Sequence, residues 1–173
     1  MKTIKLSFQK YSLREKLIET LFDISVKPYQ FLQRQRTSWR LTRTHLLAMP
    51  VGTLGHDVGQ FLMQHNFNVM DKCESHDVFH VLLSYSTDVP SEIRMQYFLL
   101  GNGRHSWYTW LTVLIGGAML PEHAYSFVSD LLKGRQCSTI KNWDLYNLLT
   151  EKTKILRGRI FNKINDPFFA NKL

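Results

Sequence analysis

Two histidines and two carboxylates lie within seventeen residues near the middle of the chain. His76, Asp77 and His80 form the pattern H-D-x-x-H, and Glu92 follows after eleven further residues. If this stretch is helical, His76 and His80 share one face with Asp77 beside them, because residues four apart are neighbours on a helix. Imidazole nitrogens and carboxylate oxygens are ligands that zinc, Fe(II) and Mn(II) accept in proteins. The spacing predicts a divalent metal site formed by these four residues.

The segments around the motif are predicted to be two helices that fold back on one another. Apolar residues recur at helical intervals from about residue 69 to residue 85, and Ser86-Thr87-Asp88 has the composition of a turn and helix cap. Pro90 suits an opening helical turn, which places Glu92 in the first turn of a helix that runs to about Leu100. If that helix is antiparallel to the first, Glu92 reaches the two histidines. If one carboxylate is not a direct ligand, a coordination position remains for water or substrate.

The rest of the chain also shows helical periodicity, and no segment shows the sustained alternation of a half-buried strand. Further helices are expected at residues 12–26, 53–66, 107–119, 121–133 and 143–162. The helix at 107–119 is apolar almost all round, which is typical of a buried helix. At 173 residues the chain has the length of a single domain. We therefore predict an all-α fold, a single-domain helical bundle of about six to eight helices with the metal site between two adjacent ones.

The charge is concentrated at the two ends of the chain. Residues 1–43 hold ten Lys/Arg against three Asp/Glu, a net charge of +7, and residues 133–173 hold nine against three, a net charge of +6. Residues 44–132, which contain the motif, carry a net charge of −5. An acidic centre suits a cation site, and basic ends suit an anionic partner such as phospholipid headgroups or nucleic acid. Ordinary solvated surfaces are the alternative explanation of both patterns.

Membrane-spanning and secreted classes are not favoured. The longest apolar run, Trp107 to Leu120, has fourteen residues, fewer than the roughly 20 that a transmembrane helix needs. Residues 1–10 contain no apolar stretch long enough for a secretory signal. The two cysteines, Cys73 and Cys137, match no metal-ligand spacing and fit a reducing compartment. We predict a cytoplasmic protein that is soluble or binds a membrane peripherally.

The four-residue signature resembles that of the coenzyme Q (ubiquinone) biosynthesis family Coq-four, whose pattern is H-D-x-x-H, eleven residues, then E. Two flanking segments are also similar to the family: Pro50-Val51-Gly52-Thr53-Leu54-Gly55 before the motif, and the apolar Trp107–Leu120 segment with Gly116-Gly117 after it. The resemblance covers residues 45–135 as a core. A basic amphipathic segment at 1–43 precedes this core, and a basic C-terminal helix at 136–173 follows it.

The resemblance implies an all-helical protein that holds a divalent metal, usually zinc, with iron or manganese as alternatives, on His76, Asp77, His80 and Glu92. It also implies an activity on the ring of a polyprenylated hydroxybenzoate, in which the carboxyl at ring carbon one is replaced by a hydroxyl. An enzyme of this kind is a metal-dependent decarboxylase, a lyase. The implied partners are the quinone precursor or another isoprenoid lipid, an anionic membrane surface and other quinone-biosynthesis proteins. Nucleic acid is not among them, and homo-oligomerisation is left open.

Further residues fit such a lipid substrate. The helix carrying Trp107, Trp110 and Leu114, with small Gly116 and Gly117, is a candidate lining for an isoprenoid tail; ordinary core packing is the alternative. His56 and Arg94 are candidates for positions just outside the metal ligands, Arg94 by neutralising the carboxylates or a substrate anion. These seven residues are expected in supporting roles and not as metal ligands.

Two other functions remain open at this point. One is a non-catalytic lipid-binding scaffold of the quinone-synthesis complex, in which the metal is structural and the four-ligand site is closed. The other is a metal-dependent phosphohydrolase of the H-D type, which needs further His and Asp ligands. The candidates for those ligands are His56, Asp57, His65 and Asp130. Ligands arriving from the helix at 53–66 would favour the phosphohydrolase.

Overall fold

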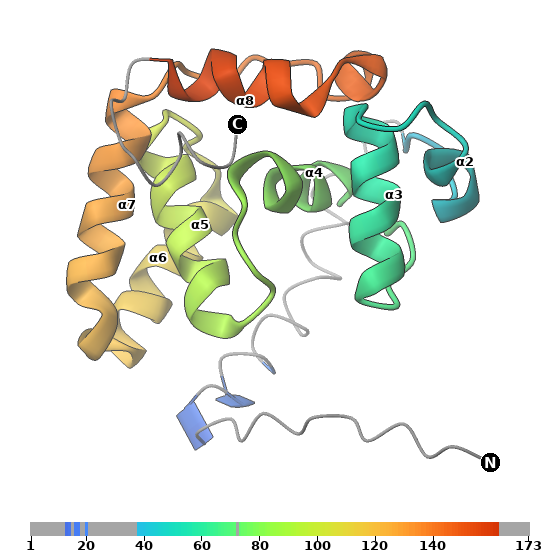
Figure 1. Cartoon of the computed structure of the whole chain (residues 1–173). Coiled ribbons are helices and arrows are strands. Elements are labelled where there is room, and N and C mark those ends of the chain that lie inside the picture. Colours follow the sequence, from blue (N-terminus) through green and yellow to red (C-terminus); the bar gives the residue numbers. More distant parts are fainter. Residues whose placement is uncertain (1–12, 15, 18–19, 21–37, 72, 163–173) are drawn as a thin grey trace.

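The computed structural model describes residues 13–14, 16–17, 20, 38–71 and 73–162 (Figure 1). Within these residues the chain forms helices and connecting turns. The only pairing of strand type among them is an isolated antiparallel bridge between Thr53 and Lys152. The predicted all-α fold is confirmed.

The described helices are α2 (Arg43–Leu47), α3 (Leu54–Gln64), α4 (Glu74–Leu83), α5 (Val89–Gly101), α6 (Trp107–Met119), α7 (Ala124–Gln136) and α8 (Thr153–Phe161), with 3-10 turns η1 (Pro121–His123) and η2 (Asn147–Thr150). Side-chain caps begin several of them. Thr53, Asp88 and Ser106 each accept a hydrogen bond from the backbone N–H three residues on, at the start of α3, α5 and α6. These bonds satisfy amide groups that a helix end otherwise leaves unpaired.

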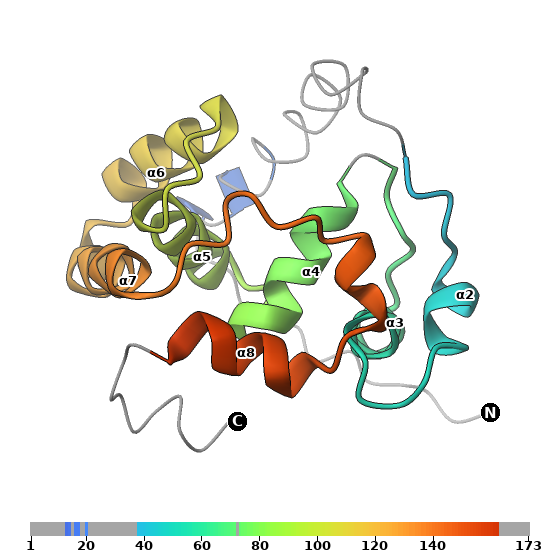
Figure 2. The ribbon, with the colours of Figure 1, turned by 90° about the horizontal axis from the view of Figure 1, so that it is seen from above.

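Helix α4, which carries the histidines, lies between two groups of helices (Figures 1 and 2). One core is formed by residues of α2, α3, α4, α5 and α8, and a smaller one lies among α5, α6 and α7. Helix α8 crosses one end of the bundle. Its first residue, Thr153, donates its N–H to Gly52 O at the α3 side, and Ile160 O near its end accepts from Ser138 N after α7. Arg157 of α8 donates to Val81 O and so covers a carbonyl in the last turn of α4, where helical carbonyls have no partner within the helix.

Helices α5 and α7 pack closely because glycines face backbone at their contact. A Cβ atom on Gly101 would lie 2.0 Å from Leu131 O, and one on Gly134 would lie 2.1 Å from Phe98 O. No side chain fits at either distance, so both positions require glycine. The close approach fixes α7 against α5, the helix that supplies Glu92.

Three expected helix boundaries were wrong. The helix with the motif begins at Glu74, not near residue 69. Helix α7 continues through Gly134 to Gln136, because here glycine permits helix packing and does not end the helix. The long helix expected at 143–162 is only α8 from Thr153 onward. The Asp144 side chain accepts hydrogen bonds from the backbone and side chain of Asn147, which favours a turn at this point.

The prediction that the Trp107–Met119 helix is buried was also wrong. One face of α6 packs on α5 through small residues and threonines, among them Thr109, Thr112 and Gly116. The opposite face is exposed: Trp107 42%, Trp110 47%, Leu111 39% and Leu114 65%. Among the described helices α6 packs mainly on α5, so an apolar composition all round does not bury its other face.

Most of the helix expected at 12–26 lies outside the described residues. Of its described residues, Leu13 and Leu17 are exposed, and Arg14 pairs with Glu122 at 3.2 Å, near the end of α6. None of the helices in the described part of the chain has the length and apolar character needed to cross a membrane.

Candidate metal centre

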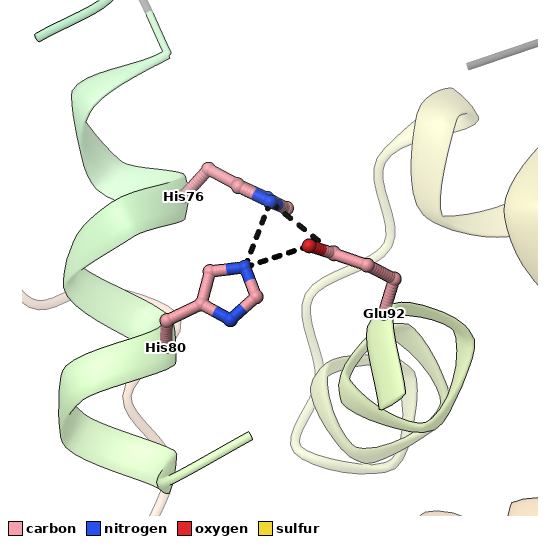
Figure 3. Close-up of side chains that lie close together, drawn as sticks. All are labelled: His76, His80 and Glu92. Atoms are coloured by element: carbon pink, nitrogen blue, oxygen red, sulfur yellow. Dashed lines mark hydrogen bonds and ion pairs between the residues drawn. The ribbon is translucent and has the colours of Figure 1, made fainter. Parts of the chain in front are cut away.

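Three of the four predicted ligands meet at one point between α4 and α5 (Figure 3). His80 Nε2 lies 2.9 Å from Glu92 Oε1, and His76 Nε2 lies 3.2 Å from Glu92 Oε2. The two Nε2 atoms are 3.1 Å apart. One ligand atom from each residue lies within 4.8 Å of the others, and no other described residues form such a group of three or more. Such a group is the size of a site for one metal ion.

Local sequence explains how these side chains converge. His76 and His80 are one helical turn apart on α4. Helix α4 ends at Ser84, whose φ of 59° turns the chain away. Asp88 then caps α5, and Pro90 lies in its first turn, as predicted. Glu92 therefore projects from the first turn of α5 toward α4.

The environment of His80 calls for a proton or a metal ion at this point. Its Nδ1 lies 3.1 Å from the carbonyl oxygen of Tyr85, and a carbonyl only accepts, so Nδ1 carries the hydrogen. In a neutral ring Nε2 of His80 then carries a lone pair and no hydrogen. This nitrogen faces both a carboxylate oxygen of Glu92 and the Nε2 of His76. These groups repel one another unless a proton or a metal ion lies among them. The donor set fits a divalent metal held by His76, His80 and Glu92.

Charges at the site are strongly coupled. Burial acts to raise the pKa of Glu92, but the neighbouring imidazoles of His76 and His80 outweigh it and lower that pKa to about 2. Burial acts to lower the pKa of His76, but Glu92, by charge and hydrogen bond, and Asp77 raise this pKa above its ordinary value. In the metal-free protein a proton on His76 therefore takes the place of a metal, so the two compete.

Metal affinity should fall as the pH is lowered. Because Glu92 and Asp77 raise the pKa of His76, metal binding should displace a proton from its imidazole. Below that pKa the apparent affinity should drop about tenfold for each pH unit and each proton displaced. Competition titrations with a chelator between pH 6 and 9 measure this slope. A flat profile would show that His76 is not a ligand.

Asp77 is placed beside this group but not within it. Its carboxylate is not among the atoms that lie within 4.8 Å of one another. Burial raises its pKa to about 6; the imidazoles of His76 and His80 act against this, and the carboxylates of Glu92 and Glu74 add to it. Asp77 therefore adds negative potential at the site without sharing its centre.

Replacing Asp77 with asparagine should stabilise the metal-free protein at pH 7. A folded-state pKa of about 6, above the ordinary 3.8, means that the folded state holds the proton more tightly than the unfolded chain. Stability is then lost as the pH rises from about 4 through 6, and Asp77→Asn should recover roughly 1–3 kcal/mol of it. The same change should weaken metal binding, because negative charge near the cation is removed. Urea unfolding at pH 4 and pH 7, with and without metal, tests both signs; equal effects at both pH values would contradict the prediction.

The two supporting candidates interact with residues outside the three-residue group. His56 is half-buried on α3, with its Nδ1 3.6 Å from the carboxylate of its neighbour Asp57. Arg94 points to α7, where its Nε lies 2.6 Å from Oδ2 of Asp130, a residue only 1% exposed. Neither joins the group of His76, His80 and Glu92.

The five candidate lipid residues lie on different sides of α6. Trp107, Trp110 and Leu114 belong to its exposed face. Gly116 is buried against Ile93, where an added Cβ would lie 2.6 Å from Cδ1, and Gly117 faces the Tyr97 hydroxyl. The glycines therefore pack α6 on α5, and only the aromatic and leucine residues are available for a partner.

Sequence reasoning missed two groups that contact His80. The Phe61 ring of α3 is stacked on the imidazole, with ring centroids 5.2 Å apart and planes 15° from parallel. The other group is the Tyr85 carbonyl. Helical periodicity identifies Phe61 only as an apolar residue, and no side-chain pattern reports a backbone carbonyl.

The fold and site together define an all-α protein with two histidines and a glutamate gathered between consecutive helices. No known family model and no curated protein sequence matches this chain. Its fold is similar to that in the crystal structure of a putative ubiquinone biosynthesis protein from Nostoc punctiforme PCC 73102, with a TM-score of 0.59 and 15% sequence identity. The match covers 90% of this chain and 83% of that one. At this identity the likeness shows a shared fold.

Proposed function

We propose that this protein binds a divalent metal ion through His76, His80 and Glu92 and acts in ubiquinone biosynthesis. The observation that carries the metal is the convergence of two imidazole Nε2 atoms and a carboxylate within 4.8 Å. Zinc is the first expectation for two nitrogens and one oxygen, with iron or manganese as alternatives. The shared fold with a protein named for ubiquinone biosynthesis supports the pathway.

The proposed reaction is the replacement of the ring carboxyl of a polyprenylated hydroxybenzoate by a hydroxyl. The carboxyl leaves as carbon dioxide, dioxygen supplies the hydroxyl oxygen, and an external two-electron reductant with two protons reduces the other oxygen atom to water. A bound divalent ion supplies Lewis-acid chemistry, or redox chemistry if it is iron or manganese. Glu92 and the buried His80 would hold the ion, and His76, the most exposed of the three at 34% of its side chain, would lie nearest to a substrate.

The alternative of a scaffold with a structural metal is less well supported. A closed site needs four protein ligands, and three described residues form this group. Three ligands leave a coordination position for substrate, which favours catalysis. The phosphohydrolase alternative needs ligands from α3, but His56 and Asp57 contact one another and lie outside the group.

The experiment that tests this function uses metal-loaded protein and a short-chain polyprenyl hydroxybenzoate. Loss of the carboxyl carbon, followed by mass spectrometry of the ring product, is expected with protein that holds one metal per chain and not with His80→Ala. The ring hydroxyl should form only in air and with a reductant supplied, whereas anaerobic loss of carbon dioxide with a hydrogen left on the ring would indicate Lewis-acid decarboxylation alone. Stoichiometric metal and lipid binding without turnover under any condition would favour the scaffold.

We propose that a peripheral membrane contact would use the exposed face of α6. Trp and Leu side chains on this face are suited to the interface between headgroups and acyl chains. The net positive charge of both terminal segments suits anionic lipid. Helix α6 would lie on the membrane without crossing it.

Substituting this face should weaken binding to anionic vesicles. The double variant Trp110→Gln/Leu114→Gln removes two large apolar side chains that are 47% and 65% exposed. Partitioning onto phosphatidylglycerol vesicles should fall at least about tenfold. Ile155→Gln on α8, also 47% exposed, is the matched control and should leave sedimentation with vesicles unchanged. Equal binding by both variants would reject α6 as the contact face.

A further inference from the structure

His80 is held on two sides by groups that are not themselves metal ligands. The ring of Phe61, from α3, is stacked on one face of the imidazole. The Tyr85 carbonyl, from the turn after α4, lies 3.1 Å from Nδ1. His76 meets the imidazole edge-on, with centroids 4.8 Å apart and planes at 76°. The imidazole, 2% exposed, is therefore enclosed before any metal is present.

These contacts select one ring orientation and one tautomer. A half-turn of the imidazole would exchange Nδ1 with Cδ2 and Nε2 with Cε1. It would remove both the hydrogen bond to Tyr85 and the nitrogen that faces Glu92. The carbonyl therefore selects the orientation and keeps the hydrogen on Nδ1, which leaves Nε2 free to bind a cation. Stacking on Phe61 fixes the plane of the ring.

The groups that hold His80 are themselves anchored. Ser84, in a left-handed conformation with φ of 59°, directs the Tyr85 carbonyl back toward α4. The Tyr85 ring lies 5.8 Å from the Arg94 guanidinium, and its hydroxyl donates to the buried carboxylate of Asp130. Phe61 is placed by α3, to which it belongs. Support for His80 thus reaches from α3 on one side to α7 on the other.

We infer that Phe61 and the Tyr85 carbonyl are positioning groups that preset His80 in its Nδ1–H tautomer for metal binding. This inference rests on the proposed metal site, but it concerns a state of the metal-free protein. A free imidazole that must be oriented on binding loses affinity in proportion to the fraction of wrong states. Outer groups that orient a ligand histidine typically contribute about 10–100-fold in metal affinity.

The test compares Phe61→Leu with Phe67→Leu, which removes a neighbouring ring that does not contact His80. Nitrogen-15 NMR of the histidine side chains reports the tautomer of His80 in metal-free protein at alkaline pH. Wild type and Phe67→Leu should show the Nδ1–H form, and Phe61→Leu a mixture. In chelator competition, zinc affinity should fall about tenfold in Phe61→Leu and stay within about twofold in Phe67→Leu. Phe61→Tyr keeps the stacked ring and should restore both readings.

Unfolding curves of the metal-free variants establish that each is folded, and Phe61→Met replaces Phe61→Leu if the latter is not. An unchanged tautomer together with unchanged zinc affinity in the Phe61 variant would overturn the inference. If wild-type protein binds no metal, the proposed function fails, but the tautomer still decides whether His80 is preset. A mixed tautomer in wild type would overturn the inference even if metal binds.

Discussion

Replacing His80 with alanine should reduce zinc affinity by roughly 100–1,000-fold. Four-ligand zinc sites contribute about 10–16 kcal/mol in apparent binding free energy, so each ligand accounts for about 3–4 kcal/mol. His80 is the most buried member of the group and the one whose second nitrogen is already fixed by a carbonyl. After its loss only two ligands remain, His76 and Glu92, which are too few to hold a metal ion at micromolar concentration. Chelator competition and metal analysis after dialysis measure the effect.

The matched control is His105→Ala, because His105 is exposed and stacks on Trp110 of α6, away from Glu92. It should retain the metal content and affinity of the wild type. Retention of both by His80→Ala would show that the convergence of these side chains serves only to pair charges. Loss in both variants would point to a general effect of removing an imidazole.

Replacing Arg94 with methionine should destabilise the protein by about 2–4 kcal/mol. Its guanidinium bridges α5 to α7 through Asp130, which is 1% exposed, and removing it leaves a buried carboxylate without its cation. Removal of one partner from a buried ion pair commonly costs about 3–5 kcal/mol, and the partial exposure of Arg94 reduces this figure. Because Arg94 also lies over the Tyr85 ring, part of the loss should be transmitted to the turn that contacts His80. Urea unfolding of the metal-free protein gives the value.

The chain offers a control for this pair in Arg14 and Glu122, whose side chains are 57% and 47% exposed. Arg14→Met should change stability by less than about 1 kcal/mol, as expected for surface ion pairs. Adding Asp130→Asn to Arg94→Met should recover part of the lost stability, because the unpaired charge is removed. A loss below 1 kcal/mol in Arg94→Met would mean that solvent, not Arg94, neutralises Asp130.

The three-residue cluster could be predicted from sequence because its geometry is local. His76 and His80 are one helical turn apart, and a short capped turn leads directly to the helix of Glu92. Helical periodicity and the Asp88 cap with Pro90 are sufficient to bring them together. Asp77 differs because it is about 100° around α4 from His76, and only the packing of α5 decides which side chains face the centre.

Features that depend on long-range packing could not be predicted. Composition identifies Trp107–Met119 as apolar. It does not reveal that one face of this helix has no described neighbour with which to pack. In the sequence, Gly134 suggests the end of a helix, yet it lies inside α7. Glycine is needed there because the carbonyl of Phe98 approaches too closely for a side chain. Phe61 reaches His80 only because α3 packs against α4. In each case the deciding contact comes from a residue far away in the sequence.

The most direct test of the account is the position of a metal in crystals of zinc-loaded protein. An anomalous difference map recorded at the zinc absorption edge should show one peak per chain, bound by Nε2 of His76, Nε2 of His80 and a carboxylate oxygen of Glu92. Zinc ligand distances of about 2.0–2.2 Å are expected for these atoms. A peak at other residues, or none at full zinc loading, would contradict the central claim that these three side chains form a metal site.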